Sequence, residues 1–72
     1  MRLSDLKSGE LGVVVSVDSV IEERLRSLGI GVGASVRQLR VAPYSKAVVV
    51  ETCGSMFFLR SEAAELIEVK RV

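Results

Sequence analysis

The sequence contains no histidine and no tryptophan, and Cys53 is its only cysteine. A single thiol without histidine excludes an intramolecular disulfide, a histidine general base and a His- or Cys-based metal site within one chain. No nucleophile–base pair of the usual kind can be assembled without histidine. We therefore predict that the protein is not an enzyme, needs no cofactor and acts as a binding module.

An excess of charge of one sign is also missing. Lysine and arginine together number 10, aspartate and glutamate 9, and the net charge is +1. The basic residues are scattered, with no run longer than two, whereas nucleic-acid-binding proteins concentrate positive charge to contact many phosphates. The charge pattern favours a partner other than nucleic acid.

Long apolar runs are absent as well. The apolar runs of the sequence are short, whereas a membrane-spanning helix needs about 20 apolar residues. After Met1 and Arg2 the chain becomes polar at Ser4 and Asp5, so it does not resemble a secretory signal. We expect a soluble, cytoplasmic protein that is not embedded in the membrane, with Cys53 reduced.

The length of 72 residues suits one domain, residues 1–72. Leu11, Val13, Val15 and Val17 alternate along a β-branched segment, which predicts a strand with these four side chains facing the core.

A helix is expected from about Val20 to Leu28, with Asp18 or Ser19 as its N-cap. Ile21, Leu25 and Leu28 would form its apolar stripe, and Gly29 would end it in a left-handed conformation, so that Ile30 folds back on the helix end.

Further β-rich segments are expected at residues 34–41, 47–53, 56–60 and 66–72, with a short helical turn at 61–65. A β-bulge near Gln38 would reconcile Val36 and Leu39, which are three residues apart. The fold class is therefore mainly β with one inserted helix. We predict a small SH3-like β-barrel of about five strands, closed to avoid open sheet edges.

Met56 and Phe58 are the most informative candidate site residues. If Phe57 and Leu59 point inward, a period of two directs Met56 and Phe58 outward. Two large apolar side chains on an outer face indicate either cover by the helix or a partner surface. Pro43 and Tyr44, in the break before the third strand, would border the same patch, which would suit a homo-oligomer equally well.

Other candidates favour a structural interpretation. Cys53 could be a reactive thiol, but a lone cysteine in a strand is more often a small core residue. Four glutamates could offer oxygens to Fe²⁺, although exposed helix carboxylates are usually only solvated; they are Glu22, Glu23, Glu62 and Glu65. No metal-binding residues are predicted.

Spacing along the chain resembles that of the ferrous iron transport protein A (FeoA) family over nearly its whole length. Arg-Leu-x-x-Leu-Gly, Ala-Pro and Leu-Arg-x-Glu-Ala occur in that order. The motif positions are Leu25, Leu28, Gly29, Gly33, Ala42, Pro43, Gly54, Leu59, Arg60, Glu62 and Ala63. The sequence departs from the expected pattern at Gln38, where an apolar strand residue would be expected.

This resemblance implies an SH3-like barrel that works with the membrane-bound ferrous iron transporter B, whose cytosolic domain is a GTPase. It implies an adaptor in bacterial iron transport that binds the transporter and modulates its assembly or GTPase-coupled transport. Such a protein would reach the inner face of the cell membrane through its partner, and the family pattern supplies no catalytic group.

Two alternative functions stay open at this point. A stand-alone, metal-responsive regulatory SH3-like domain predicts a ferrous-dependent change in thermal stability. A small RNA- or DNA-binding barrel predicts an affinity that falls steeply with salt concentration.

Overall fold

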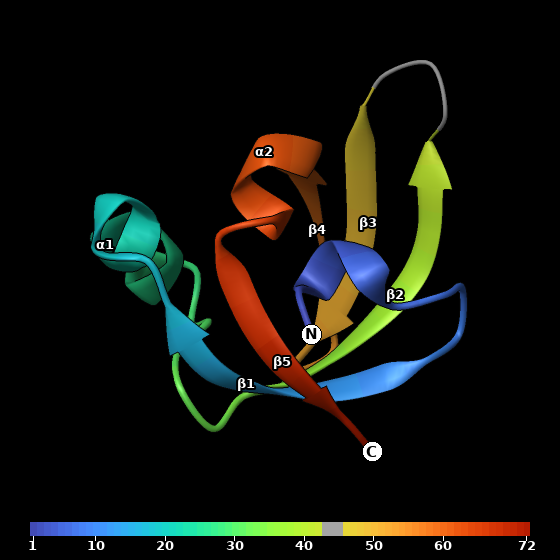
Figure 1. The fold of residues 1–72 in the computed structure, drawn as a ribbon, viewed down its shortest axis with the longest axis horizontal. Helices are drawn as coiled ribbons and strands as arrows, with labels where there is room; N and C mark the ends of the chain where they lie inside the picture. The colour runs from blue at the N-terminus through green and yellow to red at the C-terminus, as the bar shows by residue number, and fades with distance from the viewer. Residues whose placement is uncertain (43–45) are drawn as a thin grey trace.

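Five antiparallel strands form one sheet in the order β4-β3-β2-β1-β5 (Figure 1). The computed structural model describes residues 1–42 and 46–72. In chain order the elements are η1 (Leu3–Asp5), β1 (Leu11–Val17), α1 (Ser19–Ser27), β2 (Ser35–Ala42), β3 (Ala47–Thr52), β4 (Ser55–Arg60), α2 (Ser61–Ala64) and β5 (Ile67–Arg71). The sheet curls around one core, which confirms the mainly β, SH3-like fold expected from the sequence.

The curled sheet has two outer strands, and they differ in how they are covered. β5 pairs with β1 on one side, and on the other side the Val69 N–H donates to the Met1 carbonyl at 2.7 Å. An isolated bridge between Arg2 and Glu68 continues this contact. β4 pairs with β3 and has no second strand neighbour among the described residues. Among the described residues β4 and β5 do not pair with each other, and α2 connects them.

β1 faces the core with the opposite set of residues from the one predicted. Gly12 and Val14 are buried, while Val15 is 49% exposed. The register of β1 against β5 shifts between Val14 and Ser16, and this bulge returns Val17 to the edge of the core. The alternation did not predict the buried face because Val13, Val14 and Val15 are equally apolar, so the pattern fits either face of the strand.

The expected bulge in β2 is confirmed, since its register against β3 shifts between Gln38 and Arg40. Gln38 is completely buried, and its Nε2 donates a hydrogen bond to the Leu6 carbonyl. Its backbone carbonyl accepts from the Gly9 N–H at 2.6 Å, and its N–H donates to the Glu10 carbonyl at 3.0 Å. A polar residue stands at this core position because it fastens the loop before β1 to the sheet.

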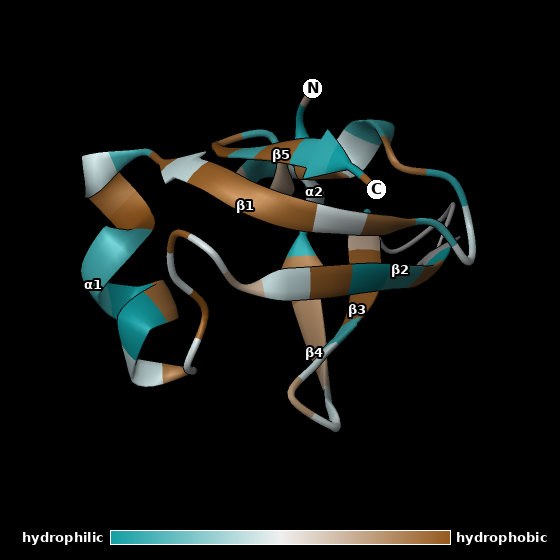
Figure 2. Ribbon diagram, turned by 90° about the horizontal axis from the view of Figure 1, so that it is seen from below, coloured by the Kyte–Doolittle hydropathy of each residue, from teal (hydrophilic) through white to brown (hydrophobic). Residues whose placement is uncertain are grey.

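α1 stands beside the sheet rather than across it (Figures 1 and 2). Asp18 caps it by accepting the Val20 N–H at 2.9 Å, as predicted. Gly29 has φ +84°, and the Ile30 N–H donates to the Leu25 carbonyl at 2.9 Å, so Ile30 folds back and is buried. Leu25 is the buried residue of α1, Ile21 is half-buried and Leu28 is 38% exposed. The predicted stripe is thus buried mainly at its centre.

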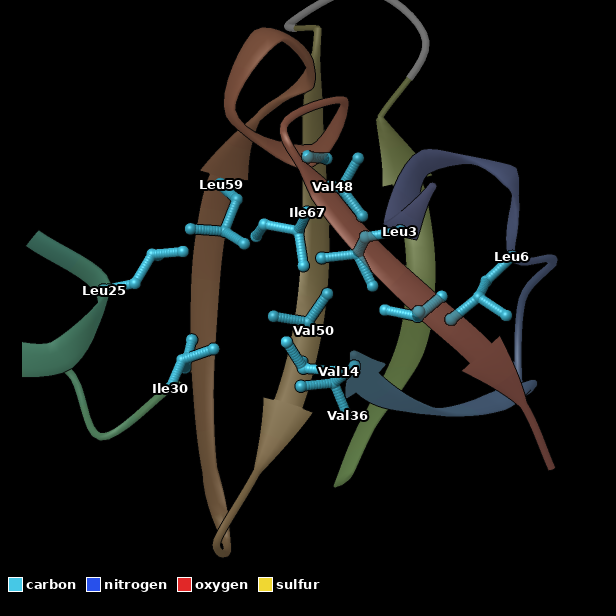
Figure 3. Packing of buried hydrophobic residues seen from close by; sticks show 12 residues of the cluster. Leu3, Leu6, Val14, Leu25, Ile30, Val36, Val48, Val50, Leu59 and Ile67 are labelled. Carbon is cyan, nitrogen blue, oxygen red and sulfur yellow. The ribbon is translucent and has the colours of Figure 1, made fainter. Parts of the chain in front are cut away.

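The core lies inside the curl of the sheet (Figure 3). Its members come from every element, and the figure shows Ile67 of β5 near Val50 of β3 and Leu59 of β4. Leu25 and Ile30 point from the α1 region toward β4.

The turn between β3 and β4 overturns the prediction for Cys53. β3 ends at Thr52, and Cys53 is exposed with φ 52°, followed by Gly54 with φ 78°. Two consecutive positive φ values are those of the tight hairpin turn that matches the twist of the flanking strands. Cys53 therefore lies in the turn instead of the core.

Candidate functional site

The outer face of β4 carries two large exposed apolar side chains. Met56 is 62% exposed and Phe58 75%, whereas Leu59 is buried and Phe57 half-buried against the core. This is the alternation that the sequence predicts, and α1 does not cover these two side chains. Exposed apolar pairs of this size are typical of surfaces that contact another molecule.

A groove of about 560 Å³ runs between α1, β4 and α2. We call it the α1–β4 groove. Ile21, Leu25 and Leu28 line it from the α1 side, and Phe58, Leu59 and Ala63 line it from the β4 and α2 side. The exposed Phe58 side chain therefore belongs both to the outer face of β4 and to the wall of this groove.

Three charged side chains also line the α1–β4 groove, namely Arg24, Arg60 and Glu62. None of them takes part in the ion pairs found within residues 1–42 and 46–72. Those pairs are Arg26–Glu22 at 2.7 Å, Arg71–Glu10 at 3.0 Å and the N-terminal ammonium–Glu68 at 3.4 Å. Two guanidinium groups against one carboxylate leave the groove with an excess of one positive charge.

The predicted partner-binding residues are placed in part. Met56 and Phe58 lie on one face of β4. Pro43 and Tyr44 lie outside the described residues, so their position beside this pair stays a prediction.

The motif residues divide into structural and groove-lining sets. Gly29, Gly33 and Gly54 have φ values of +84°, +93° and +78°, a region that glycine adopts without steric cost. Leu25 and Leu59 belong to the core, and Ala42 ends β2 opposite Ala47. Leu28, Arg60, Glu62 and Ala63 line the α1–β4 groove together with these two leucines. Much of the motif is thus gathered at one place.

Sequence reasoning missed the contribution of α1 to this site. The apolar stripe predicts that Ile21 and Leu28 face the protein interior, and nothing in the sequence singles out Arg24 as a site residue. The apolar stripe is incompletely buried because a groove separates the helix from β4. The spacing of residues along the helix does not predict the distance between these two elements.

Glu10, the carboxylate with a shifted pKa, does not line the α1–β4 groove. Glu10 accepts the Lys7 N–H at 2.6 Å and the Arg71 Nη1 at 3.0 Å. The Lys7 hydrogen bond lowers the pKa of Glu10 below its ordinary value, with Arg71 adding to the effect and desolvation opposing it. No three Asp, Glu or Cys side chains in the described part of the chain lie close enough together to hold a metal ion.

Comparison with known proteins gives consistent results. The family model described as the FeoA domain matches residues 1–71. The solution structure of the FeoA protein from Chlorobium tepidum is 35% identical, with a TM-score of 0.90, and the alignment covers 100% of this chain and 70% of that one. Iron(II) transport protein A from Clostridium thermocellum is 30% identical with a TM-score of 0.87, over 100% of this chain and 46% of that one.

The same fold occurs inside a larger regulator. A manganese-dependent transcriptional repressor, solved in complex with manganese, has a TM-score of 0.92 at 24% identity, over 100% of this chain and 36% of that one. At this identity the likeness concerns the fold alone. Among curated proteins, none matches the chain by sequence. Within the described residues, no helix has both the length and the apolar character required to cross a bilayer.

Proposed function

Since the chain belongs to the FeoA domain family, which is associated with iron uptake, we propose that it is an adaptor for the ferrous iron transporter B. In this proposal it binds the cytosolic part of the transporter and modulates its assembly or its GTPase-coupled transport. It acts in the cytoplasm and reaches the inner face of the membrane through this partner. FeoA family proteins are small accessory domains, and the proposed action is binding rather than catalysis.

The observation that carries the proposal is the exposed apolar pair on β4. Burial of apolar surface contributes about 25 cal/mol of free energy per Å². Because Met56 and Phe58 are largely exposed, they would be favourable contacts for a protein partner. Large apolar and aromatic side chains are also enriched in the energetically dominant part of protein interfaces. The adjacent groove extends this surface with the apolar side chains of α1.

We predict that replacing both residues, Met56→Ser with Phe58→Ser, weakens binding to the transporter's cytosolic GTPase domain at least about tenfold, a loss of roughly 1.4 kcal/mol. The measurement is an NMR titration of the isotopically labelled chain with that domain, in the presence and absence of nucleotide. Shifts in the unmodified chain should cluster on β4 and the groove.

The matched control is the double variant Val20→Ser with Val32→Ser. These two side chains are 82% and 72% exposed and do not line the α1–β4 groove. This variant should bind as tightly as the unmodified chain. Equal affinity of the Met56/Phe58 variant, with its fold intact by NMR, contradicts the assignment of the surface. A lack of shifts in the unmodified chain at high partner concentration contradicts the proposed partner domain.

A further inference from the structure

The backbone of β4 leaves hydrogen-bonding groups unused at the edge of the sheet. Thr52 and Ser55 close a two-residue turn, so in the β3–β4 ladder Ser55, Phe57 and Leu59 direct their N–H and C=O groups toward β3. The hydrogen bond from the Ser61 N–H to the Lys46 carbonyl, at 2.8 Å, continues the same alternation. Met56 and Phe58 therefore direct their N–H and C=O groups away from β3.

No described backbone or side-chain group pairs with these four outward groups of Met56 and Phe58. The contrast with β5 is direct, because residues Met1 and Arg2 occupy the outer edge of that strand. β4 has few of the features that usually protect an edge: it contains no proline or lysine, Arg60 is its one charged residue, and its register with β3 has no shift. Its edge is suited to receive another strand.

The α1–β4 groove lies beside this edge. Its walls are Phe58, Leu59 and Arg60 on β4 and Ile21, Arg24 and Leu25 on α1. Its volume of about 560 Å³ falls in the range of sites that hold small ligands. An extended chain placed there would find backbone partners on β4 and apolar side chains on both sides.

We propose that the partner binds by adding an extended segment of its own chain to the outer edge of β4, within the α1–β4 groove. The segment carries apolar side chains at alternate positions, which contact Phe58 on one face and the α1 leucines on the other. At least one acidic residue in it pairs with Arg24 or Arg60. The inference rests on the proposed function, since it describes how the transporter's cytosolic part would be recognised.

Charge complementarity selects this occupant over a second copy of the chain. The groove has an excess of positive charge, and Arg24 and Arg60 have no ionic partner in the described part of the protein. A second copy that paired β4 with β4 would present Ser55–Arg60, a segment without a carboxylate. A partner segment with an acidic residue would form hydrogen bonds with the open edge of β4 and an ion pair with Arg24 or Arg60.

The backbone prediction can be tested without altering a side chain, because a chain of 72 residues can be made by chemical synthesis. Replacing the amide between Phe57 and Phe58 by an ester removes the Phe58 N–H that points to the open edge. All N–H donors of the ladder with β3 are kept, although the Phe57 carbonyl, which faces β3, becomes a weaker acceptor. We expect the dissociation constant for the transporter's cytosolic GTPase domain to rise about 3- to 10-fold. An ester at Val32, whose side chain is 72% exposed outside the sheet, is the matched control and should leave binding unchanged.

Hydrogen exchange provides a second readout on the unmodified chain. The amides of Met56 and Phe58 should exchange rapidly in the free protein and slowly in the complex. The Phe57 amide, which faces β3, should be protected in both states and serves as an internal control. An Arg60→Gln variant should bind more weakly, with a smaller dependence on salt than the unmodified chain.

The outcomes separate the two proposals. If the domain binds the Phe58 ester as tightly as the unmodified chain, strand addition is wrong and the adaptor function stands. If the domain does not bind the unmodified chain, both are wrong. If sedimentation equilibrium shows a homodimer that the Phe58 ester abolishes, the edge belongs to a second copy and the partner-segment proposal is overturned.

Discussion

Gly12 shows how a single residue determines the packing of β1. A Cβ at this position would lie 3.2 Å from Leu6 Cδ1 and 3.3 Å from Val69 Cβ, which is tighter than most Cβ contacts in proteins. Both neighbours are buried core residues, so neither can move freely away. Glycine therefore fits this close approach of two layers better than a residue with a Cβ, although its φ lies outside the left-handed range.

We predict that Gly12→Ala destabilises the protein by about 1–3 kcal/mol, because overpacking outweighs the entropy that alanine removes from the unfolded chain. Urea unfolding followed by circular dichroism measures the change. Gly31→Ala is the control, because an added Cβ there meets nothing within 4 Å. It should leave stability unchanged or raise it by up to about 1 kcal/mol. Equal losses in the two variants would contradict the packing explanation.

The environments of single residues were the hardest features to predict from the sequence. The core environment predicted for Cys53 is wrong, and the reason for a polar residue at position 38 does not follow from local sequence. Gln38 is buried because the Leu6 carbonyl, 32 residues away, needs a donor. Cys53 is exposed because the hairpin closes at Thr52 and Ser55. For Cys53, residue type alone favoured the core over the turn.

The presence of helices and strands was easier to predict than which face of each element is buried. Helix α1, its Asp18 cap, the β2 bulge and the outward pair Met56 and Phe58 all follow from local periodicity and capping chemistry. The buried face of β1 did not follow, since its valines occupy adjacent positions. Local spacing also could not reveal that α1 stands away from β4 and leaves a groove, because that distance is set by packing between elements.

Attachment of α1 depends mainly on Leu25, the buried residue of this helix. We predict that Leu25→Ala costs about 2–5 kcal/mol, whereas Leu28→Ala costs less than about 1 kcal/mol because Leu28 is already 38% exposed. Denaturant unfolding of the two variants provides the comparison. Similar losses would indicate that α1 is held along its whole stripe instead of at one point.

At the scale of the whole molecule, the loop before β1 is joined to the last strand. Glu10 accepts hydrogen bonds from the Lys7 N–H and from Arg71 of β5, so residues 61 positions apart share one carboxylate. The Lys7 bond, aided by Arg71, holds the pKa of Glu10 below its ordinary value. A carboxylate of this kind stabilises the folded state when it is ionised.

The pH dependence of global stability follows from this shift. The contribution of Glu10 is fully present above the ordinary glutamate pKa and is lost as the pH falls through the lower pKa of the folded protein. We predict that Glu10→Gln loses stability at neutral pH and declines less steeply in acid, so the two proteins converge. Urea unfolding at a series of pH values measures this, and parallel curves would contradict it.

The hairpin turn has a practical consequence for spectroscopy. Cys53 is the only thiol of the chain, it is exposed, and it lies in the turn that opens β4. A fluorophore or nitroxide attached to this sulfur would be placed at a single position near the start of the strand. Distances from such a probe to a second label on a partner would give the direction in which an incoming chain runs.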